Sequence, residues 1–88
     1  MKILIDKSFE KDLKKITDQK ILNSLAECIE GARAAKGLSE LKNHRKLKGS
    51  TNAFRIRIGN YRVGLIYENR TLIFIRFLHR SKIYNSFP

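Results

Sequence analysis

The fold of this 88-residue chain is decided by residues 54–78, FRIRIGNYRVGLIYENRTLIFIRFL. Apolar and basic residues alternate at the start of this stretch, which is the period-two pattern of a strand with one buried face. Two groups of turn-forming residues, Gly59-Asn60 and Glu68-Asn69-Arg70, interrupt the apolar pattern. The stretch therefore predicts three consecutive strands joined by tight turns, over residues 54–58, 61–67 and 71–78.

Upstream of this stretch the first elements are a short strand and a helix. Residues 2–6 (KILID) are β-prone and bounded by charge, which predicts an opening strand. We expect Ser8 to cap the helix that follows, because serine favours the N-cap position. Its apolar positions share one helical face, and they are Phe9, Leu13 and Ile16.

A second helix is predicted immediately after the first. Thr17 and Asp18 can both cap it, and an apolar stripe then runs from Ile21 to Ala32. Gly37 follows as the expected stop signal. The short spacing between the two helices indicates an antiparallel helical hairpin. Beyond it, the periodicity fades, and residues 38–52 are expected to form a polar, basic connector.

The order of these elements, βααβββ, sets the expected architecture. Helices followed by hairpin-connected strands are typical of α+β domains. We predict one domain over residues 1–88, with two N-terminal helices packed on a twisted, mainly antiparallel, four-stranded sheet. Apolar residues make up 42% and charged residues 31% of the chain, as in globular proteins.

The sequence also predicts a cellular compartment. The single cysteine, Cys28, excludes an internal disulfide and suits a reducing environment. The N-terminal apolar run, Ile3-Leu4-Ile5, is too short for a signal peptide, and no apolar run is long enough to span a bilayer. We therefore expect a cytoplasmic protein that makes no use of a membrane.

The charge of the chain is concentrated in its second half. Residues 1–40 hold eight basic and seven acidic side chains, whereas residues 41–88 hold eleven basic side chains and one acid, Glu68. The predominant base changes from lysine to arginine, whose planar guanidinium matches phosphate oxygens. Ten net charges in fewer than fifty residues are tolerated more easily when a polyanion neutralises them. Nucleic acid is the polyanion that fits best.

Three arginines are expected to share one face of the sheet. Arg55 and Arg57 are two positions apart on one predicted strand, roughly 7 Å at strand rise, and Arg62 begins the next strand. Alternating arginines often do no more than solvate an outer face, but this region lacks acids to pair with them. Further cations flank the three, including Arg80 near the C-terminus. We expect four of these flanking cations to bind RNA: Arg45, Lys46, Lys48 and Lys82. Tyr84 near the C-terminus is a candidate to stack on a base.

Other kinds of site find little support in the sequence. His44, His79 and Cys28 have no metal-ligand spacing, so no metal site is expected. The glycines form neither a phosphate loop nor a dinucleotide fingerprint, so no cofactor is expected. A paired-carboxylate site cannot be built from the single acid of the basic half.

Four short motifs in the second half resemble the RelE/ParE toxin family of bacterial toxin–antitoxin systems. They are K-L-K-G (46–49), F-R-I-R-I (54–58), G-N-Y-R-V (59–63) and H-R-S-K-I-Y (79–84). The opening LIDKSFEKDLKKI, residues 4–16, is similar to the first strand and helix of that family. The resemblance covers nearly the whole chain, and it implies two N-terminal helices packed on a twisted, mostly antiparallel sheet.

The RelE branch of that family implies an activity. Its members are endoribonucleases that cut mRNA in the ribosomal A site without metal, by attack of a ribose 2′-hydroxyl that leaves a 2′,3′-cyclic phosphate. Basic residues of that branch match Arg55, Arg57 and Arg62 here. A C-terminal basic residue and a tyrosine complete the family site, and they match Arg80 and Tyr84. The resemblance also implies a cognate antitoxin whose acidic, amphipathic segment covers the basic face.

The chain departs from the family pattern at the proton acceptor. A lysine is the usual candidate, but positions 55 and 57 are both arginine, which does not lose its proton near neutral pH. The remaining candidates are His79, Lys46, Lys48, Tyr84 and the ribosome itself, and histidine has the ordinary pKa that best suits the task. Two alternatives stay open: a ParE-like poison of DNA gyrase, and an inactive relative that only binds RNA or an antitoxin.

Overall fold

The computed structural model describes residues 1–88, and their α+β arrangement confirms the predicted fold class. Its elements in chain order are β1 (Lys2–Ile5), α1 (Lys7–Leu13), α2 (Gln19–Ala34), β2 (His44–Lys46), β3 (Ala53–Ile58), β4 (Tyr61–Glu68), β5 (Thr71–His79) and α3 (Arg80–Ser86). A single 3₁₀ turn, Leu38–Glu40, lies between α2 and β2. No helix is both long enough and apolar enough to cross a membrane.

The five strands form one sheet in the order β1-β5-β4-β3-β2. Only β1 and β5 run parallel, and every other neighbouring pair is antiparallel, as the hairpin-connected sequence predicts. The register shifts between Gly64 and Leu65 of β4, where the ladder to β5 contains a bulge.

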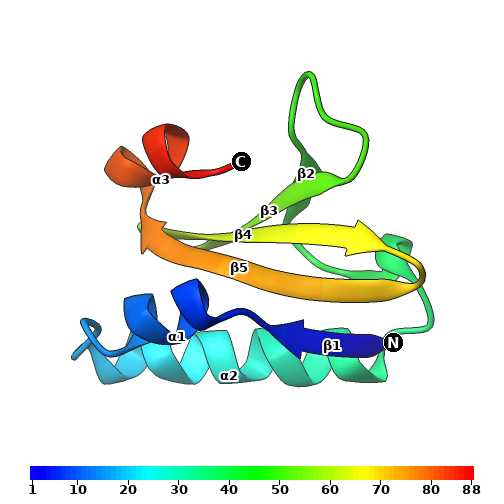
Figure 1. Cartoon of the computed structure of the whole chain (residues 1–88). Coiled ribbons are helices and arrows are strands. Elements are labelled where there is room, and N and C mark those ends of the chain that lie inside the picture. The colour runs from blue at the N-terminus through cyan, green and yellow to red at the C-terminus, as the bar shows by residue number, and fades with distance from the viewer.

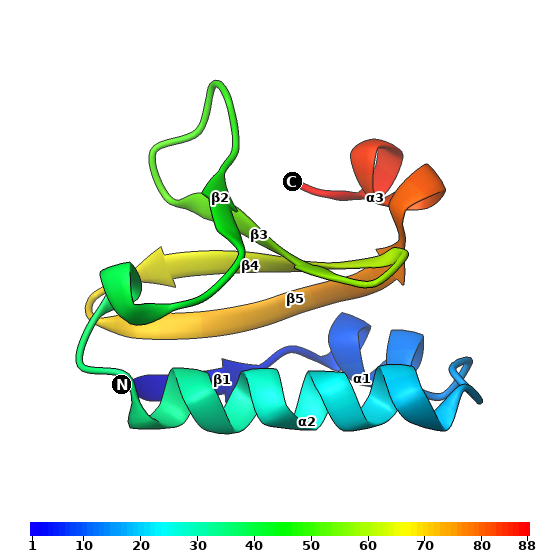
Figure 2. The same ribbon diagram turned by 180° about the vertical axis from the view of Figure 1, so that it is seen from behind.

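The two faces of the sheet are covered differently. α1 and α2 run in opposite directions along one face, while α3 lies across the other face and the β2–β3 hairpin rises on that side (Figures 1 and 2). The alternation in β3 follows from this arrangement. Phe54, Ile56 and Ile58 are buried in the main core, whereas Arg55 and Arg57 project from the opposite face.

The main core lies between the helices and the sheet. Phe9 of α1 is fully buried against the rings of Phe74 and Phe77, with centroid separations of 5.5 and 5.9 Å. Such aromatic pairs add to the free energy gained from burial alone. A second, smaller core of Ala53, Ile83 and Phe87 forms where α3 packs on the other face.

One buried charge fastens α1 to β5. The Asp12 carboxylate is 4% exposed and accepts hydrogen bonds from Arg76 Nε at 2.8 Å and Arg76 Nη2 at 3.1 Å. The same carboxylate accepts the backbone N–H of Phe77 at 2.9 Å. A buried carboxylate needs such partners, because an unpaired charge is costly away from water.

The prediction of four strands and two helices is wrong by one strand and one helix. The connector contains the edge strand β2, and the C-terminal tail forms α3. β2 carries only His44, Arg45 and Lys46, so it shows no apolar alternation and is defined by its pairing with β3. α3 is a seven-residue helix that buries Ile83, which is too little apolar pattern to recognise in sequence.

The helix ends differ from prediction at two places. The N-cap of α1 is Asp6, whose Oδ2 accepts the Ser8 N–H at 3.1 Å, so Ser8 lies inside the helix. α2 ends at Ala34 with Ala35 as an extended C-cap, and Gly37 is extended further on, so no left-handed glycine stops this helix. Of the two predicted caps of α2, Asp18 is the N-cap and accepts the Lys20 N–H at 2.9 Å.

Candidate functional site

The arginines predicted to share a face meet in one cleft. Cross-strand pairing places Arg57 opposite Arg62 and Arg45 opposite Arg55. With two other residues these four line a cavity of about 300 Å³, here called the arginine cleft: Asn43, His44, Arg45, Arg55, Arg57 and Arg62. No acidic side chain lines it. Like charges directly opposite each other on a sheet repel and lower the stability of the fold. A bound anion would offset this repulsion.

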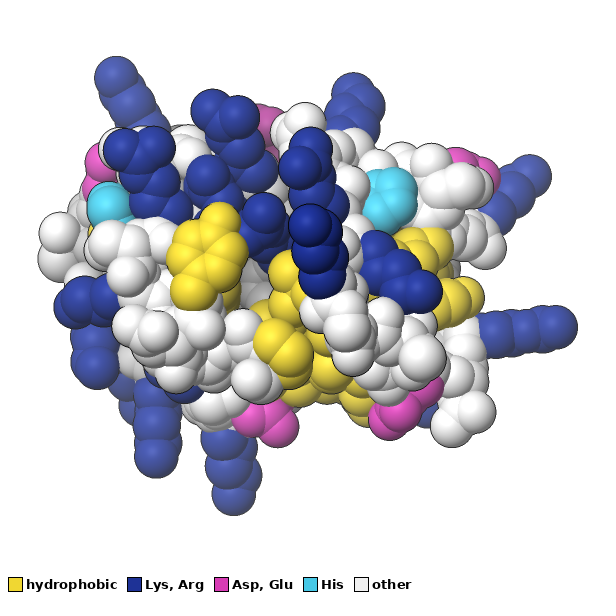
Figure 3. Space-filling model, turned by 90° about the horizontal axis from the view of Figure 1, so that it is seen from above, with side chains coloured by type: hydrophobic (Ala, Val, Ile, Leu, Met, Phe, Trp, Pro, Cys, Tyr) yellow, Lys and Arg dark blue, Asp and Glu magenta, His cyan; other side chains and the backbone are white.

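The surface view shows how the charges are distributed around the arginine cleft. Figure 3 looks onto the face that carries α3, and dark-blue Lys and Arg side chains crowd over part of it. The magenta Asp and Glu side chains lie towards the periphery of this view. A polyanion approaching this face would therefore meet positive charge first.

Arg62 is fixed by the turn between β3 and β4. Its Nη1 donates to the carbonyl oxygens of Gly59 at 3.0 Å and Tyr61 at 2.9 Å. Gly59 has φ +56°, a left-handed conformation that glycine adopts without strain, so the turn can be this tight. Desolvation by burial lowers the pKa of the Arg62 guanidinium, and the charges of Arg57 and Arg55 lower it further. Arg62 thus lacks a counter-charge.

Tyr84 is brought to the arginines by α3. Its hydroxyl oxygen accepts a hydrogen bond from Arg55 Nη1 at 2.6 Å, and Arg55 Cζ lies 5.1 Å from its ring centroid. The Tyr84 side chain is nevertheless 67% exposed. An exposed aromatic ring held beside guanidinium groups can stack on an unpaired base while the cations bind phosphate.

The position of α3 depends on a glycine in β4. Phe87, just after α3, packs directly on Gly64, and a Cβ at position 64 would lie 2.7 Å from two atoms of that ring. Phe87 and Ile83 are both buried, so they anchor the helix that carries Tyr84. Gly64 therefore sets how closely α3 approaches the sheet.

We expect Gly64→Ala to loosen α3 and to cost about 1–3 kcal/mol of stability, because the added methyl overpacks against Phe87. Hydrogen exchange of the α3 amides should report the loosening. Gly31→Ala on α2 is the matched control, since nothing lies within 4 Å of its added Cβ. Protection of α3 equal to the parent in Gly64→Ala would contradict this role.

The remaining predicted cations are spread more widely. Arg80 on α3 is close enough for its charge to lower the pKa of Arg62. Lys46 pairs with Phe54 across β2 and β3, on the helical side of the sheet. Lys46, Lys48 and Lys82 are exposed and do not line the arginine cleft. Their assignment to RNA binding stays a prediction.

His79 lies outside the arginine cleft. It is the N-cap of α3, with Nδ1 accepting the Ser81 N–H at 3.2 Å and lying 2.9 Å from Ser81 Oγ. Its ring meets that of Tyr61 edge-on at 5.6 Å, and Tyr61 packs against the main core. The proximity of His79 to Arg80 in sequence therefore does not bring its imidazole to the cleft.

Two residues of the cleft were missed by the sequence analysis, Asn43 and His44. His44 Nδ1 lies 2.7 Å from the Leu41 carbonyl oxygen. Because a carbonyl oxygen only accepts, Nδ1 carries the proton in this contact, and Nε2 of the neutral ring is left as an acceptor. Both residues lie in the segment predicted as a connector, and pairing with β3 brings this segment to the site. The His44 side chain lies on the face of Ile56 and Phe54, with its ring centroid 6.1 Å from that of Phe54, so its imidazole points away from the arginines. No group of three His, Cys, Asp or Glu side chains is arranged to hold a metal ion.

Sequence comparison identifies the family. The family model for the ParE toxin of the type II toxin–antitoxin system, parDE, matches residues 3–84. This chain belongs to the RelE/ParE toxin family. Over the whole length of both chains it is 43% identical to Toxin RelE3 of Methanocaldococcus jannaschii.

Solved structures agree with this family assignment. The chain superposes with a TM-score of 0.80 and 41% identity on a crystal structure of a RelB-RelE antitoxin-toxin complex from Methanococcus jannaschii, covering 97% of this chain and 99% of that one. The RelBE2 toxin-antitoxin complex of Mycobacterium tuberculosis matches at TM-score 0.70 and 22% identity, covering 90% and 96%. The YoeB dimer of Staphylococcus aureus matches at TM-score 0.71 and 17% identity, covering 90% and 95%. The last two share the fold.

Proposed function

We propose that this chain is the toxin of a toxin–antitoxin pair and that it cleaves mRNA in the ribosomal A site. The observation that supports this most is the arginine cleft itself. Four guanidinium groups line it without an acid, and an exposed tyrosine is hydrogen-bonded to one of them. Guanidinium groups without an acid suit the phosphates of RNA, and an exposed tyrosine beside them suits an unpaired base.

The proposed reaction is an internal phosphoryl transfer. The 2′-oxygen of the ribose attacks the adjacent phosphorus and loses its proton, and the bond to the 5′-oxygen of the next nucleotide breaks. The products are a 2′,3′-cyclic phosphate and a 5′-hydroxyl, which takes up a proton. Negative charge grows on the phosphate oxygens in the transition state, and Arg55, Arg57 and Arg62 would stabilise it there. Arg80 and Tyr84 would position the flanking nucleotide.

The proton acceptor is the open part of this mechanism. The His44 side chain shares the face of Ile56 and Phe54, away from the arginines, and the Nδ1 of His79 is engaged in capping α3. Histidine is the side chain whose ordinary pKa, about 6.5, suits a general base near neutral pH. Neither imidazole faces the arginines, so the geometry favours Tyr84, whose hydroxyl lies 2.6 Å from Arg55 Nη1, or the ribosome as the acceptor.

We expect His44→Gln to slow single-turnover cleavage on ribosomes by less than about tenfold, because its imidazole lies on the helical face of the sheet and cannot act as the general base. His79→Gln should slow it by less than about tenfold, since only a helix cap is altered. A slowing of roughly 100-fold in either variant would assign the role to that histidine. Two small effects would leave Lys46, Lys48, Tyr84 and the ribosome as candidates.

We also propose a cognate antitoxin as the partner. A relative 41% identical to this chain is seen as an antitoxin-toxin complex. An acidic, amphipathic segment would neutralise the arginine cleft and compete with RNA for it.

Primer extension on mRNA in translating extracts tests the proposed function. The parent protein should produce cuts within codons, and Arg55→Ala combined with Arg57→Ala should abolish them. A gyrase supercoiling assay runs in parallel, because the matching family model describes ParE toxins. Inhibition of supercoiling without mRNA cleavage would replace the nuclease proposal with the gyrase one.

A further inference from the structure

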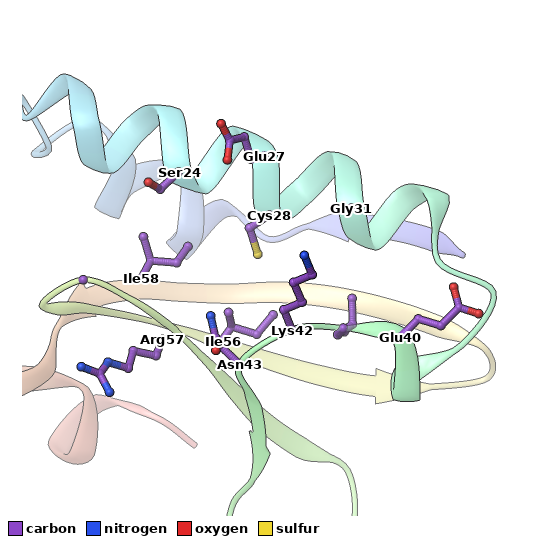
Figure 4. A pocket seen from close by; sticks show the side chains of 12 residues that line it. Ser24, Glu27, Cys28, Gly31, Glu40, Lys42, Asn43, Ile56, Arg57 and Ile58 are labelled. Atoms are coloured by element: carbon purple, nitrogen blue, oxygen red, sulfur yellow. The ribbon is translucent and has the colours of Figure 1, made fainter.

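A second and larger cavity lies on the other side of the sheet edge. It has a volume of about 460 Å³ and is here called the α2–β3 cleft, because it opens between α2 and the outer edge of β3 (Figure 4). Ile56 and Ile58 point into it from β3, and the Cys28 sulfur points into it from α2. Its polar lining comes from both sides: Ser24, Glu27, Glu40, Lys42 and Asn43.

The two clefts adjoin each other. Asn43 and Arg57 line both of them. In Figure 4 the Arg57 side chain points away from the α2–β3 cleft, so its backbone forms the border and its guanidinium belongs to the arginine cleft. A strand bound in the arginine cleft that crossed this edge of the sheet would therefore pass the mouth of the second cavity.

The two clefts differ in the charge of their lining side chains, so they favour different ligands. Apart from Arg57, the charged side chains lining the α2–β3 cleft are Glu27, Glu40 and Lys42. Neither Glu27 nor Lys42 belongs to a salt bridge. Two carboxylates against one ammonium disfavour phosphate and disfavour an acidic peptide. A neutral ligand with apolar faces and polar edges suits an apolar floor with hydrogen-bonding groups at its rim.

We propose that the α2–β3 cleft binds a nucleobase of the RNA strand whose phosphate lies in the arginine cleft. The inference rests on the proposed function for its RNA substrate. Bases of single-stranded RNA are splayed out and read along their edges in this way. The Glu40 Oε1 accepts the Lys36 N–H at 3.3 Å, which leaves Glu27 as the freer carboxylate. A carboxylate oxygen accepts readily from an exocyclic amino group, whereas the N3–H of uracil lies between two carbonyl oxygens that repel it, so Glu27 selects bases that carry an amino group over uracil.

Cys28 supplies a reporter inside the cleft. It is the only cysteine of the chain, and its sulfur faces the cavity. Desolvation by burial raises the pKa of the Cys28 thiol to about 11, so alkylation is slow and is best followed at pH 9. A ligand that fills the cleft will shield the sulfur.

The test measures alkylation of Cys28 by iodoacetamide at low salt, with 2′-O-methyl oligonucleotides that cannot be cleaved. Saturating oligo-A and oligo-C should slow the reaction at least fivefold, and oligo-U less than twofold. Inorganic phosphate should leave the rate unchanged. Equal protection by all three oligonucleotides, protection by phosphate, or none by a bound oligo-A would overturn the proposal. The assay needs no ribosome, so it can succeed where cleavage fails.

Gly31→Leu gives an independent test. Gly31 lines the cleft from α2, and nothing lies within 4 Å of a Cβ built there, so leucine will fill the cavity without strain. We expect at least tenfold weaker binding of oligo-A with unchanged binding of phosphate. Ala26→Leu, exposed on α2 and outside the cleft, is the matched control. A folded Gly31→Leu protein with parental affinity for oligo-A would overturn the proposal.

Discussion

Arg62→Ala should lower the single-turnover rate of mRNA cleavage on ribosomes by about 100- to 1,000-fold, with the protein still folded. Removing one donor aimed at charge that develops in a transition state costs about 2.7–4 kcal/mol. Arg62 fits that description, because two turn carbonyls hold its guanidinium in a cleft that contains no acid. Primer extension on stalled ribosomes measures the rate.

The Arg62→Ala variant should still fold, because the Arg62 side chain contributes mainly charge to the cleft and little packing. Truncating it relieves repulsion with Arg55 and Arg57, the neighbours that help to lower the pKa of Arg62. We therefore expect the melting temperature of Arg62→Ala to equal or exceed that of the parent. Arg33→Ala is the matched control, since Arg33 is exposed on α2 and pairs only with Glu30 at 3.6 Å. If folded Arg62→Ala stays as toxic as the parent, the gyrase alternative gains support.

The sequence predicted the fold where local pattern and burial agree. The strands over 54–58, 61–67 and 71–78 correspond to β3, β4 and β5, because alternation and turn residues mark them directly. β2 escaped prediction because an edge strand of three polar residues is specified by its neighbour rather than by its own sequence. α3 was not predicted because its two apolar anchors, Ile83 and Phe87, are buried through contacts with Ala53 and Gly64, which are distant in sequence.

The same distinction applies to the residues of the candidate site. Arg55, Arg57 and Arg62 could be placed together, since strand parity and a two-residue turn fix their common face. Tyr84 was placed from the resemblance, and α3 brings it to Arg55. His44 could not be placed, because its position depends on how a connector without periodicity pairs with β3. His79 shows the converse. It precedes Arg80 in the chain, but its imidazole lies outside the arginine cleft.

Asp12→Asn should lower the free energy of unfolding by about 3 kcal/mol, the largest stability effect we expect from a single polar substitution in this chain. Asn cannot offer Arg76 two carboxylate oxygens, and its amide must also replace the acceptor of the Phe77 N–H. Arg76 is partly exposed, with 28% of its side-chain surface accessible, so water will recover some of the loss. Small domains are stable by only about 5–15 kcal/mol, so the change is a large fraction of the total.

Urea denaturation with an unchanged m-value measures the effect of Asp12→Asn. Asp18→Asn is the matched control, because asparagine caps a helix about as well as aspartate and the change should stay within about 0.5 kcal/mol. Adding Arg76→Met to Asp12→Asn should restore part of the loss, since the guanidinium no longer lacks its partner. A double variant as unstable as the sum of the two single ones would mean that Asp12 acts through the Phe77 N–H alone. The fastening of α1 to β5 would then rest on that one backbone hydrogen bond.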